Sequence, residues 1–228
     1  MNVLDLLRAA GPLLYVLAAL SLYVVYLIVL RLQVLGKLGG DTALLFTRVH
    51  AAVMQQDLRG ALREASRERS VPANVFRAGL ERTPAGIEAA EGGMNEALLV
   101  EDQRLYAGVG ALGTVAQIAP LLGLLGTVFG MVRSFLVFSQ TSAPTPTQLA
   151  TGISEALVNT AGGLIVAVIA YVARNALRTR ADQLVAIGER AREALLSWLH
   201  EVKRRQDGSL QGAPLMMFEF DPETRVKA

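Results

Sequence analysis

Polar side chains interrupt two long apolar stretches in the second half of the chain. They are Thr127, Arg133, Glu155, Asn159 and Thr160. Their hydroxyl, amide and carboxylate groups donate or accept hydrogen bonds, so they can orient water or hold a proton path. Because an ionisable or amide group facing lipid is costly, we expect Glu155 and Asn159 to point into an assembly or a wet cavity. None of these groups is a nucleophile beside a base, so we expect no enzyme.

Metal and cofactor chemistry has little support in the composition. The chain has no cysteine, which excludes disulfides and thiolate ligands. It has two histidines, His50 and His200, and we expect surface or capping roles for both. No metal site or cofactor is therefore expected.

Three apolar stretches must position the polar groups. The chain of 228 residues is 52% hydrophobic and 18% charged, which indicates membrane segments. Residues 12–30 carry no charge and as a helix span about 28 Å, close to the thickness of a bilayer core. Residues 105–138 and 153–173 are the other two expected spans, with one charge each. A signal peptide is the alternative for the first, although no small-x-small cleavage site follows it.

The charges between the spans predict the topology. Residues 31–104 and 174–228 each hold ten Arg and Lys, whereas the connection 139–152 holds none. The positive-inside rule places the two basic segments in the cytoplasm, and the connection and residues 1–11 in the periplasm. The basic residues need no nucleic acid to explain them, and none is expected.

Outside the spans the pattern predicts helices. We expect helix within 41–70, a break at Val71–Pro72 and a new helix start at Thr83–Pro84. From Met94 one helix is expected to run unbroken into the second span, and the third span to continue past Arg174. The tail from Gly208 is expected to lack fixed structure. The fold class is an all-α integral membrane protein with three transmembrane helices and long cytoplasmic helical extensions.

The second span carries a stripe of small residues. At steps of three and four they are Gly113, Ala116, Pro120, Gly123, Thr127, Gly130 and Ser134, with Gly126 and Gly130 forming a GxxxG pair. Small residues let membrane helices approach closely. A packing seam within one chain and a pore lining explain this stripe equally well.

The third span has a matching face. At about 100° per residue, one arc of about 140° holds Gly152, Glu155, Ala156, Asn159, Thr160 and Gly163. The two antiparallel helices are therefore expected to share an interior surface.

The strings APLLGLLGTVFGMV (119–132) and GISEALVNTAGGL (152–164) resemble the signature of the TolQ/ExbB/MotA proton-channel family, most of all its ExbB/TolQ branch. Flagellar stators of the MotA type have four spans, and the three found here favour the other branch.

The resemblance implies a homo-oligomeric ring, a pentamer, in the bacterial inner membrane. Its second and third helices would surround a dimeric ExbD- or TolR-like partner with a single span. That partner carries the proton-binding aspartate, and a TonB- or TolA-like protein receives the work. The family's two pore threonines match Thr127 and Thr160, and its acidic residue matches Glu155. The structural alternative for each threonine is a hydrogen bond to a carbonyl one turn earlier.

The predicted site residues come from the spacing of small and polar residues and from the family resemblance. The expected pore-lining residues are Thr127, Thr160, Glu155, Asn159, Gly123, Gly130, Ser134 and Gly163. The expected helix-packing residues are Gly113, Ala116, Pro120, Gly126 and Ala156.

Arg133 and Glu155 are expected to form an ion pair near the outer mouth. If Thr127 and Thr160 share a depth, Arg133 and Glu155 lie about 9 and 7.5 Å further outward, at nearly equal depth. Pairing would lower the cost of both charges. The alternative is that Arg133 reaches the outer interface alone.

The predicted function is coupling of proton flow to movement of a partner across the envelope. The alternatives are a scaffold that anchors partners without ion flow, a motility stator-like channel and a self-contained transporter. The sequence does not distinguish nutrient uptake, envelope maintenance and motility.

Overall fold

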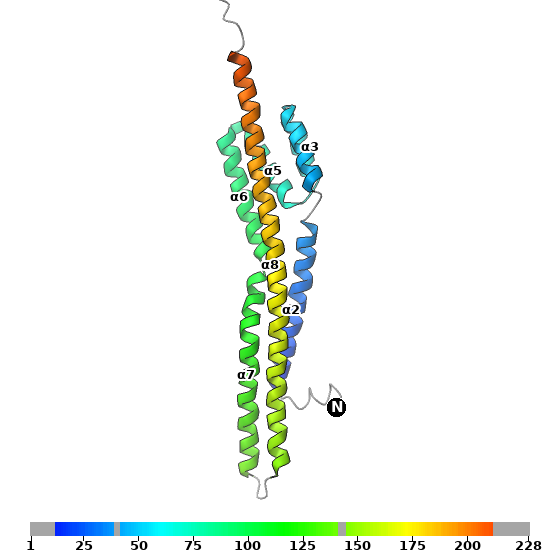
Figure 1. Ribbon diagram of the computed structural model, residues 1–228, viewed down its shortest axis with the longest axis vertical. Helices are drawn as coiled ribbons and strands as arrows, with labels where there is room; N and C mark the ends of the chain where they lie inside the picture. Colours follow the sequence, from blue (N-terminus) through cyan, green and yellow to red (C-terminus); the bar gives the residue numbers. More distant parts are fainter. Residues whose placement is uncertain (1–11, 39–41, 141–144, 212–228) are drawn as a thin grey trace, which may run out of the picture.

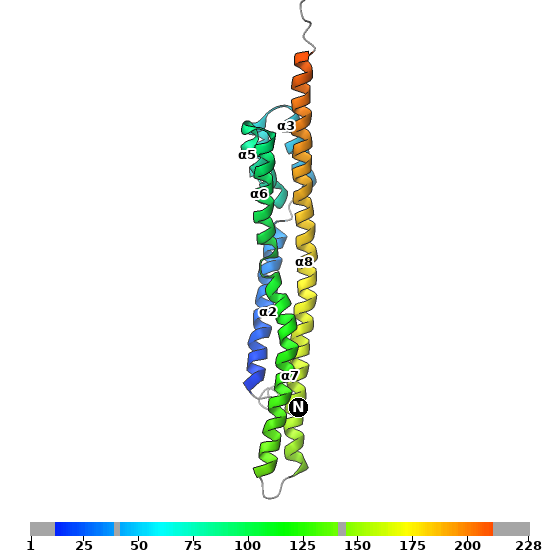
Figure 2. The ribbon, with the colours of Figure 1, turned by 90° about the vertical axis from the view of Figure 1, so that its left-hand side faces the viewer.

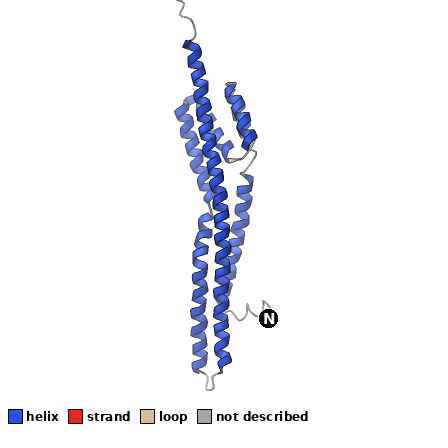
Figure 3. Ribbon diagram, viewed as in Figure 1, coloured by secondary structure: helices blue, strands red, loops and turns tan. Residues whose placement is uncertain are grey.

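A computed structural model describes residues 12–38, 42–140 and 145–211, and every regular element in them is helical (Figure 3). The helices are α2 (Pro12–Lys37), α3 (Thr42–Met54), α4 (Leu58–Ser66), α5 (Val71–Arg82), the 3-10 turn η1 (Thr83–Ala85), α6 (Ile87–Tyr106), α7 (Val109–Gln140) and α8 (Pro146–Gln211). The predicted all-α class is confirmed.

The molecule is elongated, with α8 running along almost its whole length (Figure 1). At 66 residues α8 is about 100 Å long. Helices α2 and α7 lie beside its first half, and α3, α5 and α6 lie along one side of its second half (Figure 2). The continuation of the third span past Arg174 is therefore confirmed.

Three helical stretches are long and apolar enough to cross a membrane, at Leu13–Gly36, Ile87–Gln140 and Leu149–Gly208. Many large apolar side chains of α2, α7 and α8 are exposed, among them Leu22, Leu121 and Ile165. Such a surface is too apolar for water and indicates contact with lipid or other protein. The chain is an integral membrane protein.

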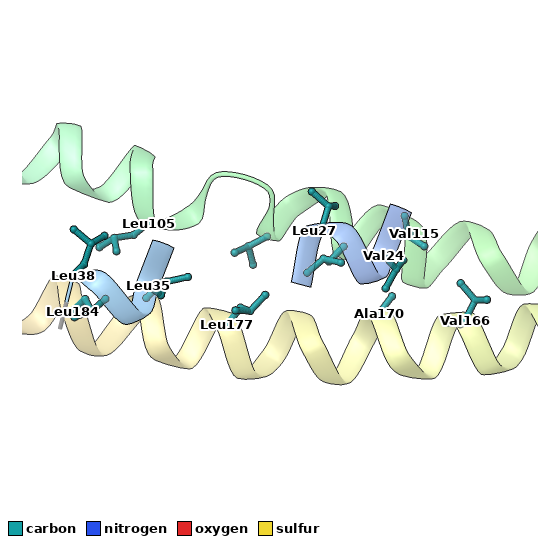
Figure 4. Packing of buried hydrophobic residues seen from close by; sticks show 14 of the residues in the cluster. Val24, Leu27, Leu35, Leu38, Leu105, Val115, Val166, Ala170, Leu177 and Leu184 are labelled. Atoms are coloured by element: carbon teal, nitrogen blue, oxygen red, sulfur yellow. The ribbon is translucent and has the colours of Figure 1, made fainter. Parts of the chain in front are cut away.

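A first apolar core joins α2, α7 and α8 where the membrane helices meet the rest of the molecule. Side chains from the three helices, including Leu27, Val115 and Leu177, point into one shared space (Figure 4). Leu105 at the end of α6 belongs to the same core. The core fixes how α2 lies against the α7–α8 pair.

A second core holds the bundle at the other end of α8. Phe76 is fully buried, and its ring lies 5.0 Å from Phe46 and 5.7 Å from Trp198 between centroids. Leu195 of α8 is also fully buried there. Because α8 contributes to both cores, it connects the membrane helices rigidly to the bundle.

The helix expected to run unbroken from Met94 into the second span is interrupted. Helix α6 ends at Tyr106, and α7 begins only at Val109. Gly108 has φ +74°, a conformation that side chains with a Cβ rarely adopt. Arg31 of α2 donates from Nη1 to the carbonyl of Arg104 at 3.3 Å, one of the carbonyls left free where α6 ends. The prediction was wrong because apolar periodicity continues across this glycine.

Other boundaries also differ from the prediction. The segment 41–70 forms two helices, α3 and α4, with Asp57 accepting from the Gly60 N–H at the start of α4. The break expected at Val71–Pro72 is present just before these residues, between α4 and α5, and Pro72 lies in the first turn of α5, where its missing N–H is harmless. Thr83–Pro84 forms the 3-10 turn η1 ahead of α6. The tail expected to lack fixed structure from Gly208 is still helical to Gln211, while residues 1–11 and 212–228 lie outside the described residues.

Candidate functional site: the α7–α8 seam and its two sides

The small residues of α7 and α8 form a tight seam between the two helices. A Cβ atom at Gly163 would lie 2.5 Å from the carbonyl oxygen of Ala119. A Cβ at Gly123 would lie 3.0 Å from the Cα of Thr160, and one at Gly130 would lie 3.0 Å from the Gly152 oxygen. These neighbours are backbone atoms that cannot rotate away, so glycine is what lets the helices approach.

Five residues predicted to line a pore belong to this seam. Gly123, Gly130, Ser134, Asn159 and Gly163 are all buried within the single chain. Ser134 donates from Oγ to the Gly130 carbonyl at 2.9 Å, within its own helix. Within the single chain the structure therefore favours the packing explanation of the stripe for Gly123, Gly130 and Ser134, and a pore-lining role of these five residues stays a prediction.

Three of the residues expected to pack helices are buried between α7 and α8. A Cβ at Gly126 would lie 2.5 Å from the Asn159 Cβ, and Ala156 is 3% exposed. Gly113 is buried against Arg174 of α8, whose Nε lies 2.7 Å from a Cβ built there. Ala116 and Pro120 are half-buried.

Arg133 and Glu155 lie on the side of the seam that faces α2, which we call the α2 side. Arg133 Nη1 is 3.7 Å from Glu155 Oε1, and the two side chains are 69% and 11% exposed. A Cβ points toward the N-terminus of its helix, so in antiparallel helices the two side chains lean toward each other. The contact expected from their depths is therefore present, with Arg133 much the more exposed partner.

A cavity of about 510 Å³ opens beside this ion pair. Its walls come from α2, α7 and α8, and the lining residues are Leu13, Val16, Gly126, Phe129, Gly130, Val132, Arg133, Leu136, Glu155 and Asn159. Glu155 therefore faces α2 and this cavity. Its expected part in a pore lining stays a prediction, because a periodic arc does not show which edge α2 covers.

Thr127 and Thr160 lie on the opposite side of the seam, which we call the threonine side. Thr127 is about 120° around α7 from Arg133, and Thr160 is about 140° around α8 from Glu155. Gly162, next to the seam on the α2 side, would place a Cβ 3.8 Å from Leu14 and Leu17 of α2. Helix α2 thus covers one side of the pair and leaves the threonine side uncovered within the single chain.

The two hydroxyl groups make different hydrogen bonds. Thr127 donates to the carbonyl of Leu124 at 2.7 Å, the intrahelical alternative considered above. Thr160 donates across the seam to the carbonyl of Gly123 at 3.2 Å. Because Thr160 packs at Gly123, Thr127 lies about one turn further along α7, so the assumption of equal depth is only approximate.

Two arginines for which the sequence analysis proposed no role lie at the other end of the membrane helices. Arg31 packs against Gly108, and Arg174 against Gly113. Each lies where an apolar stretch ends, which is the signal that could have identified them. Within the described residues, no cluster of three His, Asp or Glu side chains could hold a metal ion.

Reversing both charges of the Arg133–Glu155 pair should restore the stability that either single reversal removes. Arg133→Glu and Glu155→Arg each place like charges together, whereas the double variant restores an opposite pair. We expect a coupling energy of about 0.5–1 kcal/mol from thermal unfolding in detergent, because Arg133 is largely exposed. Purely additive effects would show that the contact contributes nothing.

Several known proteins are similar in sequence to this chain. A homologue of the biopolymer transport protein ExbB from Methanothermobacter thermautotrophicus is 25% identical over 99% of this chain and 81% of its own length. The Tol-Pal system protein TolQ of Pseudomonas aeruginosa is 33% identical over 58% of this chain and 54% of its own. The biopolymer transport protein exbB1 of Vibrio cholerae is 37% identical over 49% of this chain and 50% of its own.

The region from α5 to α8 identifies the protein family. Residues 67–190, more than half of the chain, match the profile of the MotA/TolQ/ExbB proton channel family. The matched region includes the seam, both threonines and the Arg133–Glu155 pair. The chain belongs to the MotA/TolQ/ExbB proton channel family.

Proposed function

We propose that this protein is the ExbB/TolQ-like subunit of a proton-driven motor in the bacterial inner membrane. Several copies form a ring whose threonine sides enclose the single spans of an ExbD- or TolR-like partner. Proton flow through the ring moves that partner, which passes the work across the periplasm to a TonB- or TolA-like protein. The subunit itself performs no covalent chemistry.

The observation that carries the proposal is the position of the two threonines. Both lie on the side of the α7–α8 pair that α2 leaves uncovered, amid exposed apolar side chains such as Leu124, Leu157 and Val168. Hydroxyl groups on an otherwise apolar membrane surface suit contact with a partner's polar group. The enclosed helix would supply that group.

The chain lacks a proton carrier of its own on this side. Between residues 105 and 173 the sequence has no aspartate, histidine or lysine, and its one acidic residue is Glu155. Glu155 is paired with Arg133 on the α2 side, away from both threonines. A relay past Thr127 and Thr160 therefore needs a carboxylate from another protein.

The driving force is adequate for a mechanical step. One charge crossing a potential of 100 mV releases about 2.3 kcal/mol. Two or three protons per step would release about 5–7 kcal/mol, enough to shift a two-state equilibrium almost completely. Protonation would neutralise the partner's aspartate, weaken its contact with a threonine and let its helix turn.

Proton flux into vesicles tests the proposal. Vesicles with this chain and its partner should acidify under an imposed potential, and the partner's Asp→Asn variant should abolish the flux. Vesicles with this chain alone should show no flux. Flux without any partner would identify a self-contained transporter instead.

A scaffold without ion flow is the second candidate. The hydrogen bond of Thr127 within its own helix favours it, because that hydroxyl already has an acceptor. A complex that assembles fully but conducts nothing would establish this alternative.

A further inference from the structure

We propose that the cavity on the α2 side binds one phospholipid, with an acyl chain in the cavity and the phosphate against Arg133. The inference goes beyond the motor and does not depend on it, since a chain that conducts no protons can still retain a lipid. It rests on the walls of the cavity, its opening and its charge.

The walls suit a hydrocarbon chain. Most of the lining is apolar, with polar groups only at Arg133, Glu155 and Asn159. Three wall residues, Val16, Phe129 and Val132, are at least half exposed, at 50%, 59% and 51%. The cavity therefore opens sideways from the α2–α7–α8 group, in the direction from which a lipid of the bilayer would enter.

The charge suits a phosphate. Arg133 lies seven residues before the end of α7 at Gln140, about 10 Å, and exposed apolar residues such as Phe135 and Phe138 follow it. A guanidinium at that depth needs an anionic partner or a route to the interface. Glu155 approaches one nitrogen at 3.7 Å, while the side chain of Arg133 remains 69% exposed.

The geometry of the guanidinium leaves room for a second anion. Its five N–H donors cannot all be directed at one carboxylate. Arginine and phosphate form strong hydrogen bonds that can be bidentate. A lipid whose headgroup is drawn toward Arg133 would satisfy the remaining donors and fill the apolar space beside them.

The test measures phospholipid retained by the full-length protein. The protein is reconstituted in vesicles of phosphatidylglycerol and phosphatidylethanolamine, extracted in detergent and washed, and the lipid per chain is counted by mass spectrometry. Wild type should keep about one phospholipid per chain. Arg133→Gln should keep about fivefold less, whereas Arg133→Lys should keep most of it.

A matched pair of variants tests the apolar part. Val16→Trp fills the cavity and should expel the lipid. Val25→Trp adds the same bulk to α2 at a residue of the same 50% exposure outside the cavity lining, and should leave retention unchanged. If Arg133→Gln does not fold, the comparison of Val16→Trp with Val25→Trp tests the proposal without it.

Three results would overturn the proposal. The first is wild type without retained lipid after washing, and the second is wild-type retention in both Arg133→Gln and Val16→Trp. The third is a disulfide between two copies formed from Val16→Cys and Val132→Cys variants, because a second copy would then occupy the cavity. The chain has no native cysteine to confuse that result. All three readouts are independent of proton flux.

Discussion

Gly163→Ala is expected to destabilise the pairing of α7 and α8 by about 1–3 kcal/mol. The added methyl group would lie 2.5 Å from the Ala119 oxygen and 3.0 Å from the Gly123 Cα, both backbone atoms, so the helices must move apart. Thermal unfolding in detergent, followed by circular dichroism, should show the loss. The same separation should disturb assembly of the proposed ring.

The neighbouring glycine provides the control. A Cβ at Gly162 would meet Leu14 and Leu17 at 3.8 Å, which is ordinary contact. Gly162→Ala should therefore be neutral, or stabilising by up to about 1 kcal/mol through helix propensity. Equal destabilisation by both variants would contradict the seam, because of these two glycines only Gly163 is predicted to clash.

Thr127→Ala and Thr160→Ala are each expected to reduce proton flux about tenfold or more while the complex still assembles. A hydrogen bond to a charged group contributes about 1.5–3 kcal/mol, and each 1.4 kcal/mol in a barrier is a factor of ten. The loss of stability should be small, about 0.6 kcal/mol for the interhelical bond of Thr160. Flux in vesicles and co-purification of the partner measure the two effects separately.

Two controls separate the hydroxyl from the side-chain shape. Thr→Ser at either position keeps the hydroxyl and should retain most of the flux. Thr114→Ala removes an exposed threonine of the same helix that also bonds within it, to the Gly110 carbonyl at 3.3 Å, and should leave the flux unchanged. Unchanged flux in both Thr127→Ala and Thr160→Ala would show that neither hydroxyl takes part in the proton path, which would contradict the proposal.

The sequence predicts that α7 and α8 share a surface of small residues, but it does not distinguish a packing seam from a pore lining. Gly123, Gly130 and Gly163 recur at helical steps, and close backbone approach is what such spacing permits. The order of the helices and the three apolar stretches follow equally from composition and periodicity. These features are local to one helix or to a pair of neighbours in the chain.

The division of the site into two sides could not be predicted in the same way. An arc of about 140° on α8 contains both Glu155 and Thr160, and periodicity treats it as one face. Only the position of α2, set by contacts such as Leu17 against Gly162, separates them. The break at Gly108 was missed for a related reason, since Arg31 comes from a distant part of the chain.

Crosslinking to the partner's membrane helix tests the central claim most directly. Leu124 and Phe129 are almost equally exposed, at 58% and 59%, but lie about 140° apart around α7, on the threonine side and the α2 side respectively. In a chain without native cysteine, Leu124→Cys should form a disulfide with a cysteine in the partner's single span, and Phe129→Cys should not. A disulfide from Phe129→Cys alone, in a complex that still co-purifies, would contradict the account.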